Sequence, residues 1–165
     1  METKKVLSRE NKPTNEMSSM AVKFFRGIKL EYPEVYYLDH EVNEETGMIN
    51  KELFVKHYTK NQLERNLKAL KNAYLVAKGA AAPSEILEFR TRYKISASVF
   101  SIILGFSKNT ISNIENDGIT SLSSGRLIKM CLNNRDVLHQ YIQLCDSIDT
   151  PKKEELSKRL LEESV

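Results

Sequence analysis

The sequence has few of the residues that cross-link small domains. Its only two cysteines, Cys131 and Cys145, have no second Cys or His at a ligand spacing such as C-x-x-C. A disulfide scaffold and a structural zinc site are therefore poorly supported. Free cysteines are usually packed on apolar helix faces, so the pair predicts a reducing compartment. We expect neither a metal ion nor another cofactor.

Long apolar runs are also missing. No window approaches the roughly 20 apolar residues that a membrane span requires. Residues 1–15, METKKVLSRENKPTN, lack the apolar core of a signal peptide. We therefore expect a cytoplasmic protein without a membrane partner, with a flexible polar leader over residues 1–18.

Catalytic signatures are absent as well. The sequence has no glycine-rich phosphate loop, no HExxH and no GxSxG. The three histidines, His40, His57 and His139, have no acidic or nucleophilic partner at a spacing typical of a catalytic motif. We therefore expect that the protein is not an enzyme. The net charge of +3 permits nucleic acid or another acidic partner, but it is too small for a purely electrostatic binder.

The first part of the chain, residues 19–79, is predicted to be a small α+β domain. Aromatic and β-branched residues with partial period-two alternation fill residues 19–39. Breaks at Arg26-Gly27 and Tyr32-Pro33 divide this run, which predicts a small antiparallel sheet of short strands.

A helical stretch is predicted from about Asn50 to Lys78. Thr59 and Gln62 match a capping box, so a second helix could open near Thr59. The basic residues of this stretch are solvated, or they add phosphate contacts beside a DNA-binding module. One apolar stripe is predicted to contain Leu63, Leu67, Leu70 and Tyr74.

The segment KGAAAPSE, residues 78–85, marks a predicted boundary. Gly79 can end a helix in a left-handed conformation, and Pro83 suits the first position of the next helix. We therefore place a linker at residues 80–84 and a second domain at residues 83–147.

Residues 96–116 indicate two helices joined by a tight turn. Ser96 is a suitable N-cap for a helix over residues 97–104, and Gly105 can supply the positive φ that the turn requires. Ser107 is predicted to cap a polar helix over residues 107–116. The small Ser101 permits close approach of the two backbones, and the apolar anchors of the second helix are Ile111 and Ile114.

The segment SASVFSIILGFSKNTISNIENDG resembles the lambda-repressor-like (Xre) helix-turn-helix family. Ala97 stands where that family commonly has a glutamine. The flanking segments extend the resemblance over residues 83–146 to the C-terminal domain of MqsA-type (YgiT-type) antitoxins and to the domain that precedes SocA-like antitoxin domains. The matching positions are Ser96, Leu104, Gly105, Phe106, Ser107, Thr110, Ile111, Ser112, Ile114, Glu115 and, one place late, Gly118.

The resemblance implies a mainly α fold. The expected architecture is a C-terminal five-helix lambda-repressor-like helix-turn-helix domain with a small α+β N-terminal region. An amphipathic charged helix is expected over residues 150–165, where it docks on a partner protomer or packs within its own. The resemblance also implies a structural ion pair between Glu115 and an arginine of the first helix, for which Arg90 is the candidate.

In this family the second helix of the pair lies in the major groove, with its N-terminal residues toward base edges. The alternative is an ordinary polar surface helix. The candidates for base contacts are Lys108, Asn109, Thr110 and Asn113. The candidates for contacts to the DNA backbone are Ser107, Ser98, Asn116, Lys94 and Arg126.

These features predict a sequence-specific transcriptional regulator that binds double-stranded DNA. The resemblance implies the antitoxin of a toxin-antitoxin pair, with a cognate toxin as a possible partner. A single unit of this size reads few bases, so we expect a homodimer that represses its own operon at a palindromic operator. The alternative is a protein-interaction or toxin-neutralising module whose helix-turn-helix does not bind DNA.

Overall fold

The computed structural model describes residues 4–162, and the chain divides into two compact units between Ala73 and Tyr74. This boundary lies inside helix α1 (Lys60–Ala77), ahead of the linker predicted at residues 80–84. The predicted leader and the predicted C-terminal helix each include three residues, 1–3 and 163–165, that lie outside the described residues.

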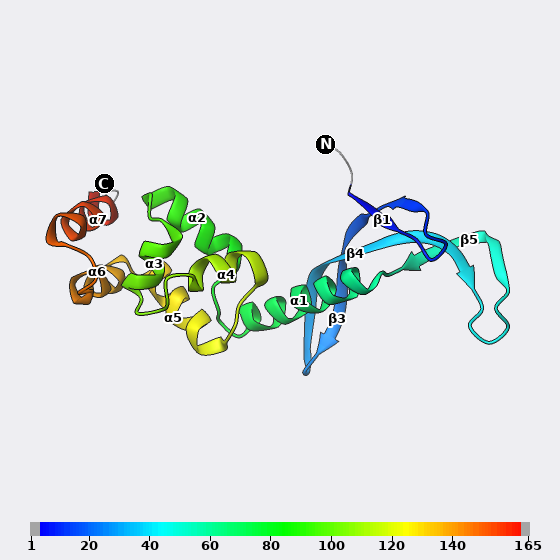
Figure 1. The fold of residues 1–165 in the computed structure, drawn as a ribbon. Coiled ribbons are helices and arrows are strands. Elements are labelled where there is room, and N and C mark those ends of the chain that lie inside the picture. Colours follow the sequence, from blue (N-terminus) through cyan, green and yellow to red (C-terminus); the bar gives the residue numbers. More distant parts are fainter. Residues whose placement is uncertain (1–3, 163–165) are drawn as a thin grey trace. The chain divides into compact units, whose positions relative to one another are not determined.

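The expected mainly α fold, with five C-terminal helices and a small N-terminal region, is wrong. The described residues form seven helices and two antiparallel sheets, which is an α+β architecture (Figure 1). All five strands lie in the first unit, which extends to Ala73. The alternation that predicted a few short strands therefore underestimated how much of this unit pairs as sheet.

The first unit contains a two-stranded and a three-stranded sheet. Strands β1 (Lys5–Leu7) and β2 (Pro13–Asn15) pair antiparallel within the segment that was predicted to be a flexible leader. Strands β3 (Met17–Phe25), β4 (Ile28–Val42) and β5 (Ile49–His57) form an antiparallel sheet in the order β3-β4-β5. The prediction of an antiparallel sheet is confirmed, whereas the leader over residues 4–18 is wrong because β1, β2 and the start of β3 occupy it.

Two strand predictions need correction. Strand β4 continues for 15 residues through Tyr32-Pro33, where Pro33 lies opposite Met20 of the edge strand β3. The alternate side chains of Tyr32 and Tyr36 are buried, which favours an extended chain over the predicted break. Strand β5 replaces the first part of the helix predicted from Asn50, because that segment pairs with β4 over residues 37–42.

Helix α1 begins where the capping box predicted. The Gln62 side chain accepts from the N–H of Thr59 at 3.0 Å, and the Thr59 hydroxyl accepts from the N–H of Gln62 at 3.1 Å. The predicted leucine stripe is mostly wrong: Leu63 and Leu67 are 54% and 48% exposed, and Leu70 alone is buried. Besides Leu70, the buried side of α1 carries two polar residues, Gln62 and Asn66.

The carboxamide of Asn66 explains why a polar residue is buried there. It accepts from the N–H of Val35 at 2.8 Å and donates to the carbonyl of Val35 at 2.9 Å. Strand β5 pairs with β4 only from Tyr37 onward, so Val35 has no partner residue on that strand. Asn66 thus satisfies backbone groups that the sheet leaves open, at a sequence separation that no local pattern reveals.

The second unit is built from helices around one apolar core. The core includes Leu156 and Leu160 of the last helix, both 0% exposed. This supports packing of the C-terminal helix within its own protomer rather than docking on a partner. The helices that follow α1 are α2 (Pro83–Tyr93), α3 (Ala97–Ile103), α4 (Thr110–Asp117), α5 (Leu122–Asn133), α6 (Arg135–Leu144) and α7 (Thr150–Glu162).

The segment predicted to be a linker is packed into the second unit. Ala80 and Ala81 are 1% and 0% exposed, and the N–H of Ala81 donates to the carbonyl of Gly125 at 3.0 Å. Gly79 has a φ of +104° after the end of α1, and Pro83 is the first residue of α2, as predicted. The small alanines therefore serve close packing rather than a solvated connection. No helix within residues 4–162 combines the length and apolar character needed to cross a membrane.

Candidate nucleic-acid interface

Helices α3 and α4 are joined by the tight turn that the sequence predicted. Gly105 has a φ of +81° and is exposed, and its N–H donates to the carbonyl of Ile102 at 3.0 Å. Apart from Gly105 and its two chain neighbours, no residue has an atom within 4 Å of where a Cβ would stand. Glycine is therefore required at this turn by backbone conformation and not by lack of space.

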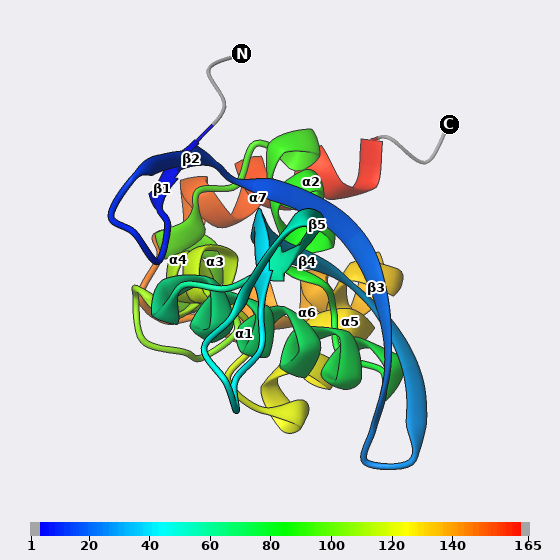
Figure 2. The same ribbon diagram turned by 90° about the vertical axis from the view of Figure 1, so that its right-hand side faces the viewer.

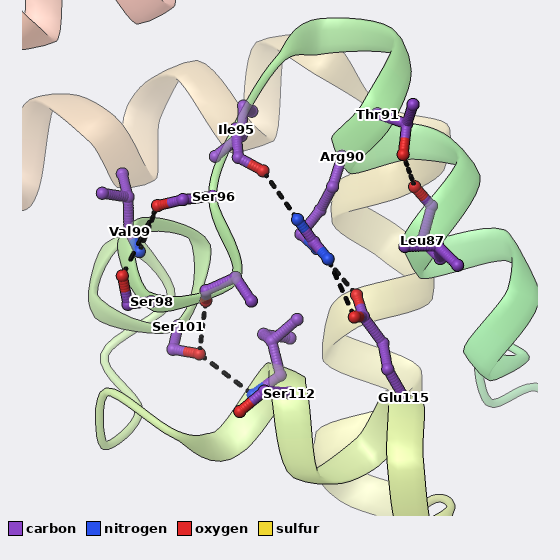
Figure 3. Close-up of polar contacts among 12 residues, drawn as sticks. Leu87, Arg90, Thr91, Ile95, Ser96, Ser98, Val99, Ser101, Ser112 and Glu115 are labelled. Carbon is purple, nitrogen blue, oxygen red and sulfur yellow. Dashed lines mark hydrogen bonds and ion pairs between the residues drawn. The ribbon is translucent and has the colours of Figure 1, made fainter.

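Ser101 connects the two helices through its hydroxyl group. The side chain is 0% exposed, donates to the carbonyl of Ala97 at 2.8 Å and accepts from the N–H of Ile111 at 3.0 Å (Figure 3). The sequence predicted only a small residue at this position. The additional role of Ser101 is to satisfy the N–H of Ile111, a donor in the first turn of α4 that the helix itself leaves without an acceptor. The presence of serine rather than alanine on a buried face of α3 was the signal in the sequence that could have indicated this hydrogen bond.

Replacing Ser101 with alanine is expected to lower the free energy of unfolding by about 1 to 2 kcal/mol. The N–H of the buried Ile111 would lose its acceptor in a site closed to water. Urea denaturation followed by circular dichroism measures this loss. Ser84→Ala, at an exposed position of α2, is the matched control, and equal stability of the two variants would contradict the assigned role of Ser101.

Helix α4 begins later than predicted. Its N-cap is Asn109, and the Ser107 hydroxyl pairs with the Thr110 hydroxyl at 2.9 Å instead of capping a backbone N–H. The carbonyl of Ser107 already accepts from the N–H of Thr110 at 3.0 Å, which makes residues 107–110 a turn before the helix. Ser107 as N-cap of a helix over residues 107–116 is therefore wrong. The predicted anchors are confirmed, because Ile111 and Ile114 are both 0% exposed.

Arg90 and Glu115 form the predicted ion pair. Arg90 Nε lies 2.7 Å from Glu115 Oε1, and Arg90 Nη2 lies 2.8 Å from Oε2 (Figure 3). Arg90 Nη1 also donates to the carbonyl of Ile95 at 3.0 Å, and the two charged side chains are 15% and 12% exposed. The hydrogen bonds to Glu115 raise the pKa of Arg90, against the opposing effect of burial. The pair fastens α4 to α2 and neutralises the Glu115 carboxylate.

The four candidates for base contacts lie together at the N-terminal end of α4. Lys108, Asn109 and Asn113 are exposed, and Thr110 is half-buried. Within residues 4–162, no hydrogen bond or ion pair engages the side chains of Lys108, Asn109 and Asn113. This end of α4 therefore presents amide and ammonium groups to the surroundings, while two isoleucines hold the opposite side in the core.

The candidates for backbone contacts are spread over more elements. Ser107 and the exposed Asn116 flank the base-contact set, whereas Ser98 lies in the first turn of α3, with its hydroxyl 3.4 Å from that of Ser96. Lys94 is the C-cap of α2, with a φ of +53° and an exposed side chain. Arg126 Nε donates to the carbonyl of Lys78 at 2.9 Å, so part of this guanidinium is already engaged within the unit.

The exposed side chains at this site offer hydrogen-bond donors and acceptors. Exposed amides and an ammonium group can donate to base edges or phosphates, and the nearby carboxylate of Glu115 is held by Arg90. Within residues 4–162 no group of three or more His, Cys, Asp or Glu residues could hold a metal ion. Comparisons with family models, curated proteins and solved structures found no significant match to this chain.

Proposed function

We propose that this chain is a sequence-specific DNA-binding transcriptional regulator in which the N-terminal end of α4 reads base edges in the major groove. One observation carries the proposal: Lys108 in the turn before α4, Asn109 at its N-cap and Asn113 within it are exposed and unpaired among the described residues, while the other side of α4 is fixed in the core. A polar side chain presented on a rigidly held helix loses little conformational freedom on binding, which favours base-specific contacts.

Each exposed side chain has a matching group on DNA. The ammonium group of Lys108 can donate to guanine O6 and N7 or to a phosphate. The carboxamides of Asn109 and Asn113 can each pair with adenine N6 and N7. Because Glu115 is paired with Arg90, the central part of α4 has no free carboxylate to repel the phosphates.

We further propose that the protein acts as a homodimer on a palindromic operator and represses its own operon as an antitoxin. Two copies related by a two-fold axis would double the number of bases that α4 reads. The resemblance of residues 83–146 to MqsA-type antitoxins supports this role.

Asn109→Ala is expected to weaken binding to operator DNA by about 1 to 3 kcal/mol while leaving the melting temperature nearly unchanged. The Asn109 side chain makes no capping hydrogen bond, so its removal costs α4 little stability. Fluorescence anisotropy with operator and scrambled duplexes measures the change in affinity.

The matched control is Asn133→Ala, at an exposed position at the end of α5. This variant should bind operator DNA like the wild type. An Asn109→Ala protein that also binds like the wild type would contradict base recognition by this residue. An equal loss on the scrambled duplex would assign Asn109 to a phosphate instead.

A further inference from the structure

The turn end of the β3–β4 ribbon is a second exposed surface with a distinctive charge. Arg26 and Gly27 form a two-residue turn with φ angles of +49° and +81°, and Phe25 lies opposite Ile28 across it. Positive φ at both central residues is the geometry of a tight hairpin turn, which keeps the two strands about 5 Å apart up to the tip. In Figures 1 and 2 this turn lies at the end of the first unit that is remote from β1 and β2.

This end of the ribbon is positively charged on both of its faces. Lys23, Arg26 and Lys29 lie within seven residues, and the first acidic residues along the chain are Glu16 before them and Glu31 after them. Lys29 lies opposite Phe24, and Lys23 lies opposite Leu30. Because neighbouring residues of a strand face opposite sides, Lys23 and Lys29 are on different faces of the ribbon. Among the described residues, neither lysine has an acidic partner.

The same tip also exposes an aromatic ring. Phe24 is 72% exposed, and Arg26 lies over the neighbouring Phe25 ring at 5.2 Å from its centroid.

The shape of the ribbon favours duplex DNA as its partner. A two-stranded ribbon fits the groove of duplex DNA, where phosphates line both walls. Cations on both faces of the ribbon match two such walls. A lipid surface presents a single plane, so it would leave the lysine on the other face without an anionic partner.

We propose that the turn end of the β3–β4 ribbon is a second DNA-contacting surface, in which Lys23 and Lys29 bind phosphates on opposite sides of a groove. This inference rests on the proposed function, because it assigns contacts with the same class of partner, duplex DNA, to the first unit. It assigns a role to a part of the chain that the helix-turn-helix motif does not include. The ribbon contributes affinity that depends on salt and not on base sequence.

The test compares the full-length variant K23Q/K29Q with the full-length control K5Q/K51Q. Lys5 and Lys51 are exposed strand residues of the same unit, and Lys51 lies near the opposite end of β4 from the turn. Affinities for the DNA upstream of the protein's own gene and for a scrambled duplex of equal length are measured by fluorescence anisotropy at several salt concentrations. K23Q/K29Q is expected to make the slope of log K against log salt less negative by about 0.9 for each lost phosphate contact, or about 1.8 in all.

The expected result is the same loss of affinity on both duplexes for K23Q/K29Q, with K5Q/K51Q behaving like the wild type. Phe24→Ala, which removes no charge from the tip, should keep the wild-type salt slope. A K23Q/K29Q protein with the wild-type slope would overturn the inference while leaving the site on α4 intact. Vesicles with anionic lipid that bind the wild type but not K23Q/K29Q, at unchanged DNA affinity, would overturn it as well. Wild-type protein that binds neither duplex would refute the proposed function and the inference together.

Discussion

Replacing Glu115 with alanine is expected to lower the free energy of unfolding of the helical unit by about 3 kcal/mol. Arg90 would remain largely buried with its positive charge and two of its donors unpaired, since both of its bonds to Glu115 would be lost. Removing one partner of a buried pair costs more than the pair itself contributes, because the remaining charge is not resolvated. The expected loss lies at the low end for such pairs because both side chains keep some contact with water.

Urea denaturation followed by circular dichroism checks this prediction. Glu88→Ala is the matched control, because Glu88 is an exposed carboxylate on α2 with no hydrogen bond or ion pair among the described residues. Removal of this surface charge is expected to change the stability by at most about 0.5 kcal/mol. If Glu115→Ala lost no more stability than Glu88→Ala, the ion pair would not be what fastens α4 to α2.

Gly125→Ala is expected to destabilise the same unit by about 2 to 3 kcal/mol. In the middle of an exposed helix this substitution usually stabilises by about 1 kcal/mol. Here the new Cβ would lie 2.5 Å from Cβ of Ala80 and 3.3 Å from Cγ2 of Ile119. Ala80 cannot easily retreat, because the N–H of the adjoining Ala81 is bonded to the carbonyl of Gly125 itself.

The control for Gly125→Ala is Met130→Ala, at a 57% exposed position of the same helix. Thermal and urea denaturation of the two variants separate the effect of close packing from that of helix propensity. A Gly125→Ala protein as stable as the wild type would show that Ala80 and α5 do not approach as closely as the structure indicates.

Features governed by neighbouring residues could be predicted from the sequence. The capping box at Thr59, the N-cap at Ser96 and the positive φ at Gly105 each depend on a few adjacent backbone groups. The anchors Ile111 and Ile114 follow from helical spacing. The exposure of Asn113 was predicted for the same reason, since it occupies a position of α4 that the anchors leave outward.

Features governed by distant residues could not be predicted. Strand β5 was mistaken for helix because its own sequence shows no clear alternation of apolar and polar residues. Its pairing with β4, on the other side of a turn, determines that it is a strand. The burial of Asn66 depends on Val35, which lies 31 residues earlier in the chain.

The start of α4 was misplaced for a local reason. Ser107 and Asn109 are both good capping residues, and the turn at Ser107 decides between them.

The affinity of the wild-type protein for the DNA upstream of its own gene, compared with a scrambled duplex of equal length at physiological salt, tests the central claim most directly. Base reading by α4 predicts binding at least about 1,000-fold tighter to the upstream DNA, with a steep loss as salt is added. Equal affinity for the two duplexes, or binding to neither, would contradict base reading by Lys108, Asn109 and Asn113.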